Sequence, residues 1–161
     1  MTPEMFQNLN DQINNEFYNS LVYLTISNFY AQQKFNGLAA LFKKQSEEEK
    51  GHAQKFIDYL LKFESGQEIK IEIKSPTQEW KNLYLPFEAA LSLEKTTTKE
   101  IIELMKLAIK YEDFAAQDLL QWYVTEQVQE EHQFNDLIAQ IKLGGSYNDL
   151  ALRLLNDRLF A

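Results

Sequence analysis

The sequence predicts an all-α protein: a four-helix bundle with one long crossover between its second and third helices, followed by a short fifth helix. Three observations support this fold class. Apolar residues recur at helical spacing in four long segments, and the few prolines and glycines, apart from Gly51, lie at the segment boundaries or between the segments. Only one connection between these segments is long, and a single long crossover is a known arrangement for such a bundle. At 161 residues the chain is expected to form one domain, residues 1–161.

The first two helices form the first predicted hairpin. The first helix begins at Thr2-Pro3-Glu4, which supplies an N-cap, a proline at the first helical position and an acid in the first turn. It is expected to run to about Lys34, and Asn36-Gly37 break it. The second helix covers about Leu38 to Glu64 and ends at Ser65-Gly66.

A long connection follows, from Gln67 to about Asn82. Its apolar residues alternate with polar ones, which predicts a mostly extended backbone against a surface; the alternating residues are Ile69, Ile71 and Ile73. The third helix is then expected from near Pro86 to around Lys110.

The C-terminal part is expected to contain a fourth long helix and a short fifth one. Asp113 is suited to cap the fourth helix, which continues to about Leu143 before Gly144-Gly145 end it as a C-cap. Ser146 and Asp149 have the spacing of a capping box, so the fifth helix is expected from about Tyr147 to Leu159.

The composition excludes several classes of protein. The net charge of -8 argues against nucleic-acid binding, which needs a basic surface, and fits a protein that attracts cations. No apolar run approaches the roughly 20 residues of a membrane-spanning helix, and the N-terminus lacks the features of a secretory signal. The absence of cysteine excludes disulfides and thiolate metal ligands and fits a cytoplasmic location.

An acidic residue interrupts the apolar stripe of each long helix near its middle third. In the second helix, Glu49 and His52 stand one turn apart on the stripe, a spacing that suits two ligands of one metal ion. The four stripes contain no Lys or Arg. The polar residues on these four stripes that are candidates for a metal site are Glu16, Glu49, His52, Glu94, Gln127 and Glu130.

Buried carboxylates need a compensating charge. One that is unpaired costs several kcal/mol in a low-dielectric interior, and four would cost more than the roughly 5–15 kcal/mol by which a domain is stable. Two divalent metal ions match the number of acids, and the alternative is that the carboxyl groups stay protonated. Oxygen-rich ligation with a single imidazole favours iron or manganese over zinc.

Four segments of the chain form a recognisable set. They are Glu16 with Tyr23 one heptad on, Glu49-Lys50-Gly51-His52, Glu94, and Leu120-Gln121-Trp122-Tyr123-Val124-Thr125-Glu126-Gln127 running into Glu130. This set resembles that of the non-haem bacterial ferritins, within the ferritin-like di-iron proteins, and the resemblance covers essentially the whole chain.

The resemblance implies a ferroxidase centre inside the bundle. Glu16, Glu49 and His52 would bind the first iron. Glu49 would bridge to a second iron held by Glu94 and Glu130, with Gln127 beside it. Tyr23 would lie near the centre and donate an electron or a hydrogen bond; the alternative is a core aromatic residue with a satisfied hydroxyl.

The resemblance also implies an iron-storage function with no haem. Dioxygen or peroxide would oxidise two Fe(II), and the Fe(III) would pass to a mineral. The mineral would lie inside a hollow shell of 24 identical subunits, with the fifth helix around the four-fold axes. A charge of -8 per subunit would then help to draw Fe(II) inward.

Bacterial members of this family often carry a third iron site, and the matching positions are Glu48, Glu126, Gln129 and Glu130. The family commonly has a carboxylate where Gln129 stands, and an amide is a weaker iron ligand. We therefore expect a weak or absent third site, with Glu48 and Glu126 either ligands or plain solvated acids. His132 is expected to be a surface residue, so the fourth helix lacks the second Glu-x-x-His of bacterioferritins and rubrerythrins.

Two other functions remain open at this level. One is a di-metal oxidoreductase that turns over a small substrate, and the other is a metal-free structural bundle with protonated or solvated acids. Metal binding separates the structural bundle from the two metal proteins, and the number of irons taken up separates storage from small-substrate turnover.

Overall fold

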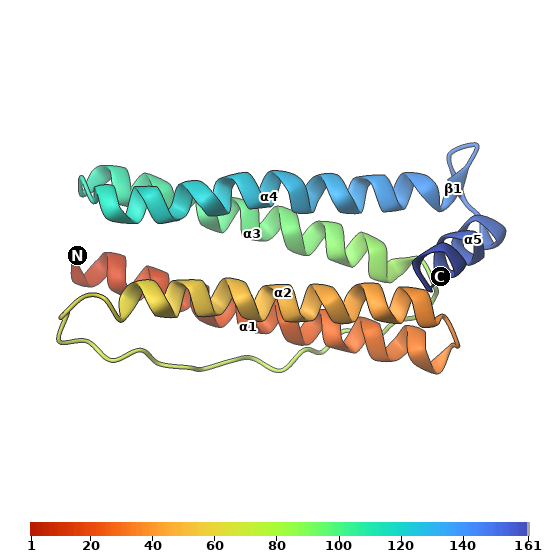
Figure 1. Cartoon of the computed structure of the whole chain (residues 1–161), viewed down its shortest axis with the longest axis horizontal. Coiled ribbons are helices and arrows are strands. Elements are labelled where there is room, and N and C mark those ends of the chain that lie inside the picture. Colours follow the sequence, from red (N-terminus) through yellow and green to blue (C-terminus); the bar gives the residue numbers. More distant parts are fainter. Residues whose placement is uncertain (161) are drawn as a thin grey trace.

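The computed structural model describes residues 1–160 and confirms the predicted four-helix bundle (Figure 1). Its elements in chain order are α1 (Pro3–Gln32), α2 (Asn36–Leu60), α3 (Leu85–Lys110), α4 (Phe114–Gln140), β1 (Lys142–Leu143), β2 (Ser146–Tyr147) and α5 (Asp149–Phe160). In Figure 1, α2 and α4 lie on the near side of the bundle, and α1 and α3 lie behind them. No helix in this described range has the length and apolar character needed to cross a membrane.

The turn between α1 and α2 differs from the prediction. Thr2 caps α1 as expected, since its hydroxyl oxygen accepts a 3.2 Å hydrogen bond from the backbone N–H of Met5. The chain turns before Asn36, at Lys34, whose φ of 66° is left-handed. Asn36-Gly37 therefore begin α2 instead of breaking a helix. Gly37 is required by packing, because a Cβ there would lie 2.0 Å from the carbonyl oxygen of Asn156 in α5.

The long crossover is extended, as predicted, but it pairs with side chains and forms no strand in the described residues between α2 and α3. Asn10 of α1 accepts a 2.8 Å hydrogen bond from the backbone N–H of Lys70 and donates a 3.0 Å bond to its carbonyl. Ile69 packs against the core, whereas Ile71 is 51% exposed. The α2 helix ends at Leu60 and not at about Glu64 as predicted, so the crossover begins earlier in the chain.

The prediction for the connection after α4 was wrong. Gly144 and Gly145, with φ of 60° and 82°, form the two-residue turn of a hairpin in which β1 pairs with β2, so they are not a helix C-cap. Ser146 belongs to β2 and does not cap α5. Asn148 does so instead, because its side-chain oxygen accepts a 2.9 Å hydrogen bond from the N–H of Ala151.

The core consists of two apolar clusters with a polar layer between them. One cluster lies at the end of the bundle near α5 and contains Tyr23, Phe42 and Phe134; the other contains Met5 and Tyr123, toward the N-terminus of α1. On each long helix, the buried residues between the two clusters are polar. These are Glu16, Asn19 and Ser20 on α1, Gln45, Ser46, Glu49 and His52 on α2, Glu94 and Thr97 on α3, and Gln127 and Glu130 on α4.

Candidate metal centre

The polar layer brings together all six polar candidates that the sequence predicts. None is more than 6% exposed, and each long helix contributes at least one; they are Glu16, Glu49, His52, Glu94, Gln127 and Glu130. Helical periodicity explains the convergence, because each lies on the buried stripe of its helix at a similar depth along the bundle.

Half of the centre is formed by α1 and α2. The Nδ1 atom of His52 lies 3.1 Å from Oε2 of Glu49, and one ligand atom each of Glu16, Glu49 and His52 lies within 4.8 Å of the others. The Oε1 atom of Glu16 accepts a 2.8 Å hydrogen bond from Gln12. The Oε2 atom is buried and has no hydrogen-bond partner in the described residues. Burial of such an oxygen costs free energy unless a cation binds it or a proton is attached to it.

The other half comes from α3 and α4, with one contribution from α1. The hydroxyl of Tyr23 donates to Oε1 of Glu94. Gln127 donates to Oε2 of Glu94 over 3.1 Å and to its backbone carbonyl over 3.2 Å. Both oxygens of the Glu94 carboxylate thus accept a hydrogen bond, which fixes the orientation of that carboxylate.

Glu130 is held from α2. Gln45 donates a 2.9 Å hydrogen bond to Oε2 of Glu130, and Gln133 in turn donates a 3.1 Å bond to the amide oxygen of Gln45. Neither Gln45 nor Gln12 is among the residues that the sequence predicts for the site. Both lie four residues before a predicted acid, which is the available sequence signal for residues on the same helical face.

The electrostatics of the centre favour a cation. Burial raises the pKa of Glu49 well above its usual range, and the charges of Glu94 and Glu16 raise it further. Burial is also the main cause that raises the pKa of Glu94 to about 7 and that of Glu130 to about 8. Among residues 1–160, no Lys or Arg is buried that would offset these charges. The donor set therefore fits divalent cations that prefer oxygen ligands.

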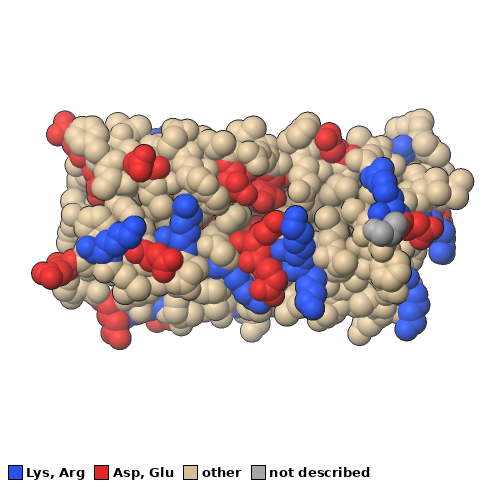
Figure 2. Space-filling model, viewed as in Figure 1, with Lys and Arg blue, Asp and Glu red and all other residues tan. Residues whose placement is uncertain are grey.

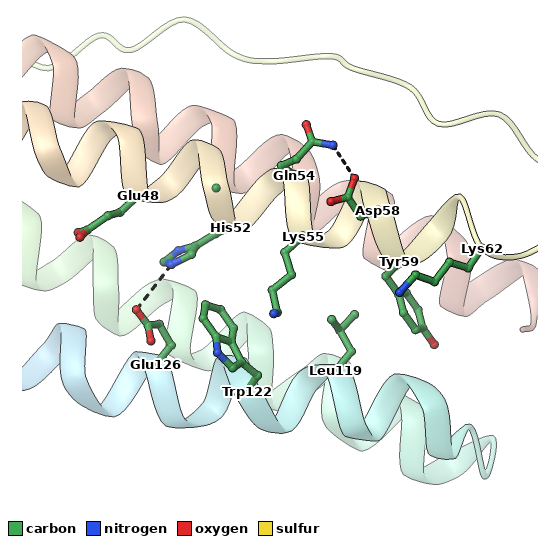
Figure 3. A pocket seen from close by; sticks show the side chains of 11 residues that line it. Glu48, His52, Gln54, Lys55, Asp58, Tyr59, Lys62, Leu119, Trp122 and Glu126 are labelled. Atoms are coloured by element: carbon green, nitrogen blue, oxygen red, sulfur yellow. Dashed lines mark hydrogen bonds and ion pairs between the residues drawn. The ribbon is translucent and has the colours of Figure 1, made fainter.

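Two of the four candidates for a third site, Glu48 and Glu126, line a groove of about 670 Å³ between α2 and α4, at the edge of this centre. Figure 3 shows Glu126 reaching toward His52, and its carboxylate lies 3.8 Å from the imidazole Nε2. Ligand atoms of His52, Glu126 and Glu130 lie within 4.8 Å of one another. Glu48 lines the same groove, where it pairs with Lys44 at 3.3 Å.

Gln129 and His132 lie outside this arrangement. Gln129 is exposed, and His132 is an exposed residue, as predicted, that lies 3.2 Å from Asp136. Acidic side chains nevertheless gather near the middle of the face that carries α2 and α4 (Figure 2). The groove can therefore offer carboxylate ligands even though the residue at position 129 is an amide.

Comparisons with known proteins agree with this fold. The chain matches the ferritin-like domain family over residues 6–144. It is 34% identical to a bacterial non-haem ferritin of Campylobacter jejuni, covering 92% of this chain and 89% of that one. It is 35% identical to a bacterial non-haem ferritin of Bacteroides fragilis, covering 90% and 91%.

A solved structure gives the same result for the fold. The open pore ferritin of the hyperthermophilic archaeon Archaeoglobus fulgidus superposes with a TM-score of 0.91 at 32% identity, covering 99% of this chain and 97% of that one. From the family match and the similarity along nearly the whole length, we conclude that this chain belongs to the ferritin family.

Proposed function

We propose that this protein stores iron and that it oxidises Fe(II) to Fe(III) at the buried carboxylate centre. The observation that carries the proposal is the convergence of buried acids from all four long helices without a buried Lys or Arg in residues 1–160. Family membership supports iron chemistry at this position of the fold. The whole chain would act as one ferritin-like domain.

The substrate Fe(II) would bind in two positions. Glu16, Glu49 and His52 would hold the first ion, and Glu94 and Glu130 would hold the second. Glu49 suits the bridging role, because the charges of both Glu94 and Glu16 contribute to raising its pKa. Gln127 would orient Glu94 beside the second ion.

Binding would displace protons from the centre. The pKa values of Glu94 and Glu130 are raised to about 7 and about 8, so near neutral pH a substantial fraction of these groups carries a proton in the metal-free protein. Two Fe(II) supply the positive charge that lets the carboxyl groups ionise. Oxidation would then transfer one electron from each ion to dioxygen or peroxide.

The family resemblance supports further parts of the proposal. The Fe(III) would pass to a mineral inside a shell of 24 copies of the chain, in a cytoplasmic protein without haem. Glu48 and Glu126 would serve at most a weak third site, because Gln129 supplies no carboxylate. A small-substrate di-iron enzyme is the alternative that shares the same centre.

Anaerobic titration with Fe(II), followed by air, tests the proposal. We expect two Fe(II) per chain to bind and oxidise rapidly, and further additions to give a soluble core of many irons per chain. Uptake that ends at two irons would favour the small-substrate enzyme, and absence of binding would reject both metal functions.

Variants of single acids test the site assignment. Glu94→Ala and Glu130→Ala should slow oxidation by about 100-fold or more while the protein stays assembled, because each removes a substrate ligand. Glu103→Ala is the matched control, since Glu103 is an exposed acid of α3 that pairs with Lys106 at 2.6 Å. Unchanged oxidation in both site variants would show that the assignment is wrong.

A further inference from the structure

The buried centre has a polar connection to the side of the bundle opposite the groove between α2 and α4. Gln12, on α1, is only 2% exposed and stands one turn before Glu16. Its amide nitrogen lies 2.8 Å from Oε1 of Glu16 and 3.4 Å from Oε2 of Glu100, on α3. One buried amide thus touches an acid of the centre and an acid outside it.

Glu100 opens to the surface. It is half-buried and lines a hollow of about 270 Å³ between α1 and α3, together with Gln12. The other acids that line this hollow, Asp11 and Glu103, leave it acidic although Lys99 lines it too. Figure 1 places α1 and α3 behind α2 and α4, so this hollow lies on the other side of the bundle from the groove of Figure 3. A polar path therefore leads from solvent to the centre, first past Glu100, then past Gln12 and finally to Glu16.

A purely structural role explains this arrangement poorly. Gln12 already has a short hydrogen bond to Glu16, and its contact with Glu100 is at the outer limit of hydrogen-bond length. A second acid this close to Glu16 adds repulsion to a centre that already contains buried carboxyl groups. Moreover, Oε2 of Glu16 has no protein partner in residues 1–160. These features suit a path for a cation.

We propose that Glu100 and Gln12 form an access path by which Fe(II) reaches Glu16 from the face of α1 and α3. The inference rests on the proposed function. Glu100 takes the ion from the surface hollow, and rotation of the Gln12 side chain opens the way and presents its amide oxygen. Carboxylate and amide oxygens are both suitable transient ligands for a hard divalent cation. Glu16 then receives the ion at the first position.

The test compares Glu100→Gln with Glu103→Gln in the assembled protein. Both changes remove one negative charge from α3, but Glu103 is a largely exposed residue at the rim of the hollow that pairs with Lys106, whereas Glu100 is half-buried and lies 3.4 Å from Gln12. The initial rate of aerobic oxidation is measured against Fe(II) concentration. Anaerobic Co(II) titration, followed by absorption, counts the metal ions that the centre holds.

We expect Glu100→Gln to raise the Fe(II) concentration for half-maximal rate by about fivefold or more, because the rate of capture depends on charge at the point of encounter. The maximal rate and the two Co(II) per chain should stay as in the unmodified protein. Glu103→Gln should shift the half-maximal concentration by less than about twofold. Gln12→Leu should slow Co(II) binding without changing its stoichiometry.

Three outcomes would overturn the inference. The first is that Glu100→Gln changes the half-maximal Fe(II) concentration no more than Glu103→Gln does. The second is that Glu126→Gln, on the opposite face, raises this concentration instead, and the third is that Glu100→Gln lowers the maximal rate or the Co(II) stoichiometry. Failure of the proposed function itself looks different, since the unmodified protein would then not oxidise Fe(II), not bind two Co(II), or take up no iron beyond two ions per chain. If Gln12→Leu does not fold, Glu100→Gln still decides.

Discussion

The hydroxyl of Tyr23 donates a hydrogen bond to the carboxylate of Glu94, so a residue of α1 fixes a metal-ligand candidate of α3. Tyr23 also stacks on Phe134 of α4, with ring centroids 5.9 Å apart and an interplanar angle of 10°. The side chain is fully buried. Tyr23 is therefore both a residue of the apolar cluster and a hydrogen-bond donor to the centre. From the sequence these two roles are alternatives, but the side chain has both.

Tyr23→Phe separates these two roles, because it keeps the ring and removes only the hydroxyl. We expect the fold and the binding of two Fe(II) to persist. Oxidation should slow by about tenfold or more, since one hydrogen bond to a charged group contributes about 1.5–3 kcal/mol and 1.4 kcal/mol is a factor of about ten in rate. The pKa of Glu94 should rise further, so the loss should be greater at pH 6 than at pH 8. Rates equal to those of the unmodified protein at both pH values would contradict this role.

The metal-free protein should lose stability as the pH rises. The pKa of Glu94 is about 7 and that of Glu130 about 8 in the folded chain, against an ordinary value of 4.5, so the folded state holds protons that the unfolded state releases. Their contribution is complete below about pH 4.5 and is lost progressively as the pH rises to about 8.

Thermal unfolding of the metal-free protein between pH 5 and 8.5 measures this loss. Saturation with Zn(II), which is redox-inert, should weaken the dependence because the ion replaces the protons. Glu130→Gln should also weaken it, since the amide does not titrate. A melting temperature that rises steadily across this range in the metal-free protein would be the opposite of our expectation.

The candidate centre was predictable from sequence because burial and helical periodicity decide it. Glu16 and Glu94 each occupy a stripe position, and straight packed helices bring such positions together. Gln12 was not found, because periodicity says which face a side chain occupies but not which side chain of another helix it meets. Its contact with Glu100 joins residues 88 apart in the chain.

The C-terminal connection was harder for a different reason. The glycine pair Gly144-Gly145 fits a helix C-cap and a hairpin turn equally well, because both require positive φ. Short-range signals of this kind are decided by tertiary packing. The long helices do not share this ambiguity, because each repeats its pattern over several turns.

Gly37→Ala should disturb the docking of α5 while leaving the centre intact. The added Cβ would meet the backbone carbonyl of Asn156 at 2.0 Å, so α5 must shift, at a cost of about 1–3 kcal/mol. The shift would also weaken the 3.1 Å hydrogen bond from the N–H of Leu38 to the side chain of Asn156. We expect a lower melting temperature and weaker assembly by size-exclusion chromatography, with Co(II) binding retained.

Gly51→Ala is the matched control on the same helix. A Cβ at Gly51 meets no atom within 4 Å, and alanine favours a helix over glycine by up to about 1 kcal/mol. This variant should be as stable as the unmodified protein or more so. If both variants behaved alike, the contact between Gly37 and α5 would have no part in stability or assembly.

Gln129→Glu tests why the third site should be weak. The substitution adds a carboxylate on the exposed face of α4, beside the groove where Glu126 and Glu130 lie near His52. A third oxygen ligand with a negative charge should strengthen binding there, because hard divalent ions prefer carboxylates to amides. We expect the number of tightly bound Fe(II) in an anaerobic titration to rise from two to three per chain.

Gln121→Glu is the control for this variant, since it adds the same charge to an exposed position two turns earlier on α4. A rise in both variants would reflect charge alone, and a rise in neither would show that the amide at position 129 is not what limits the site.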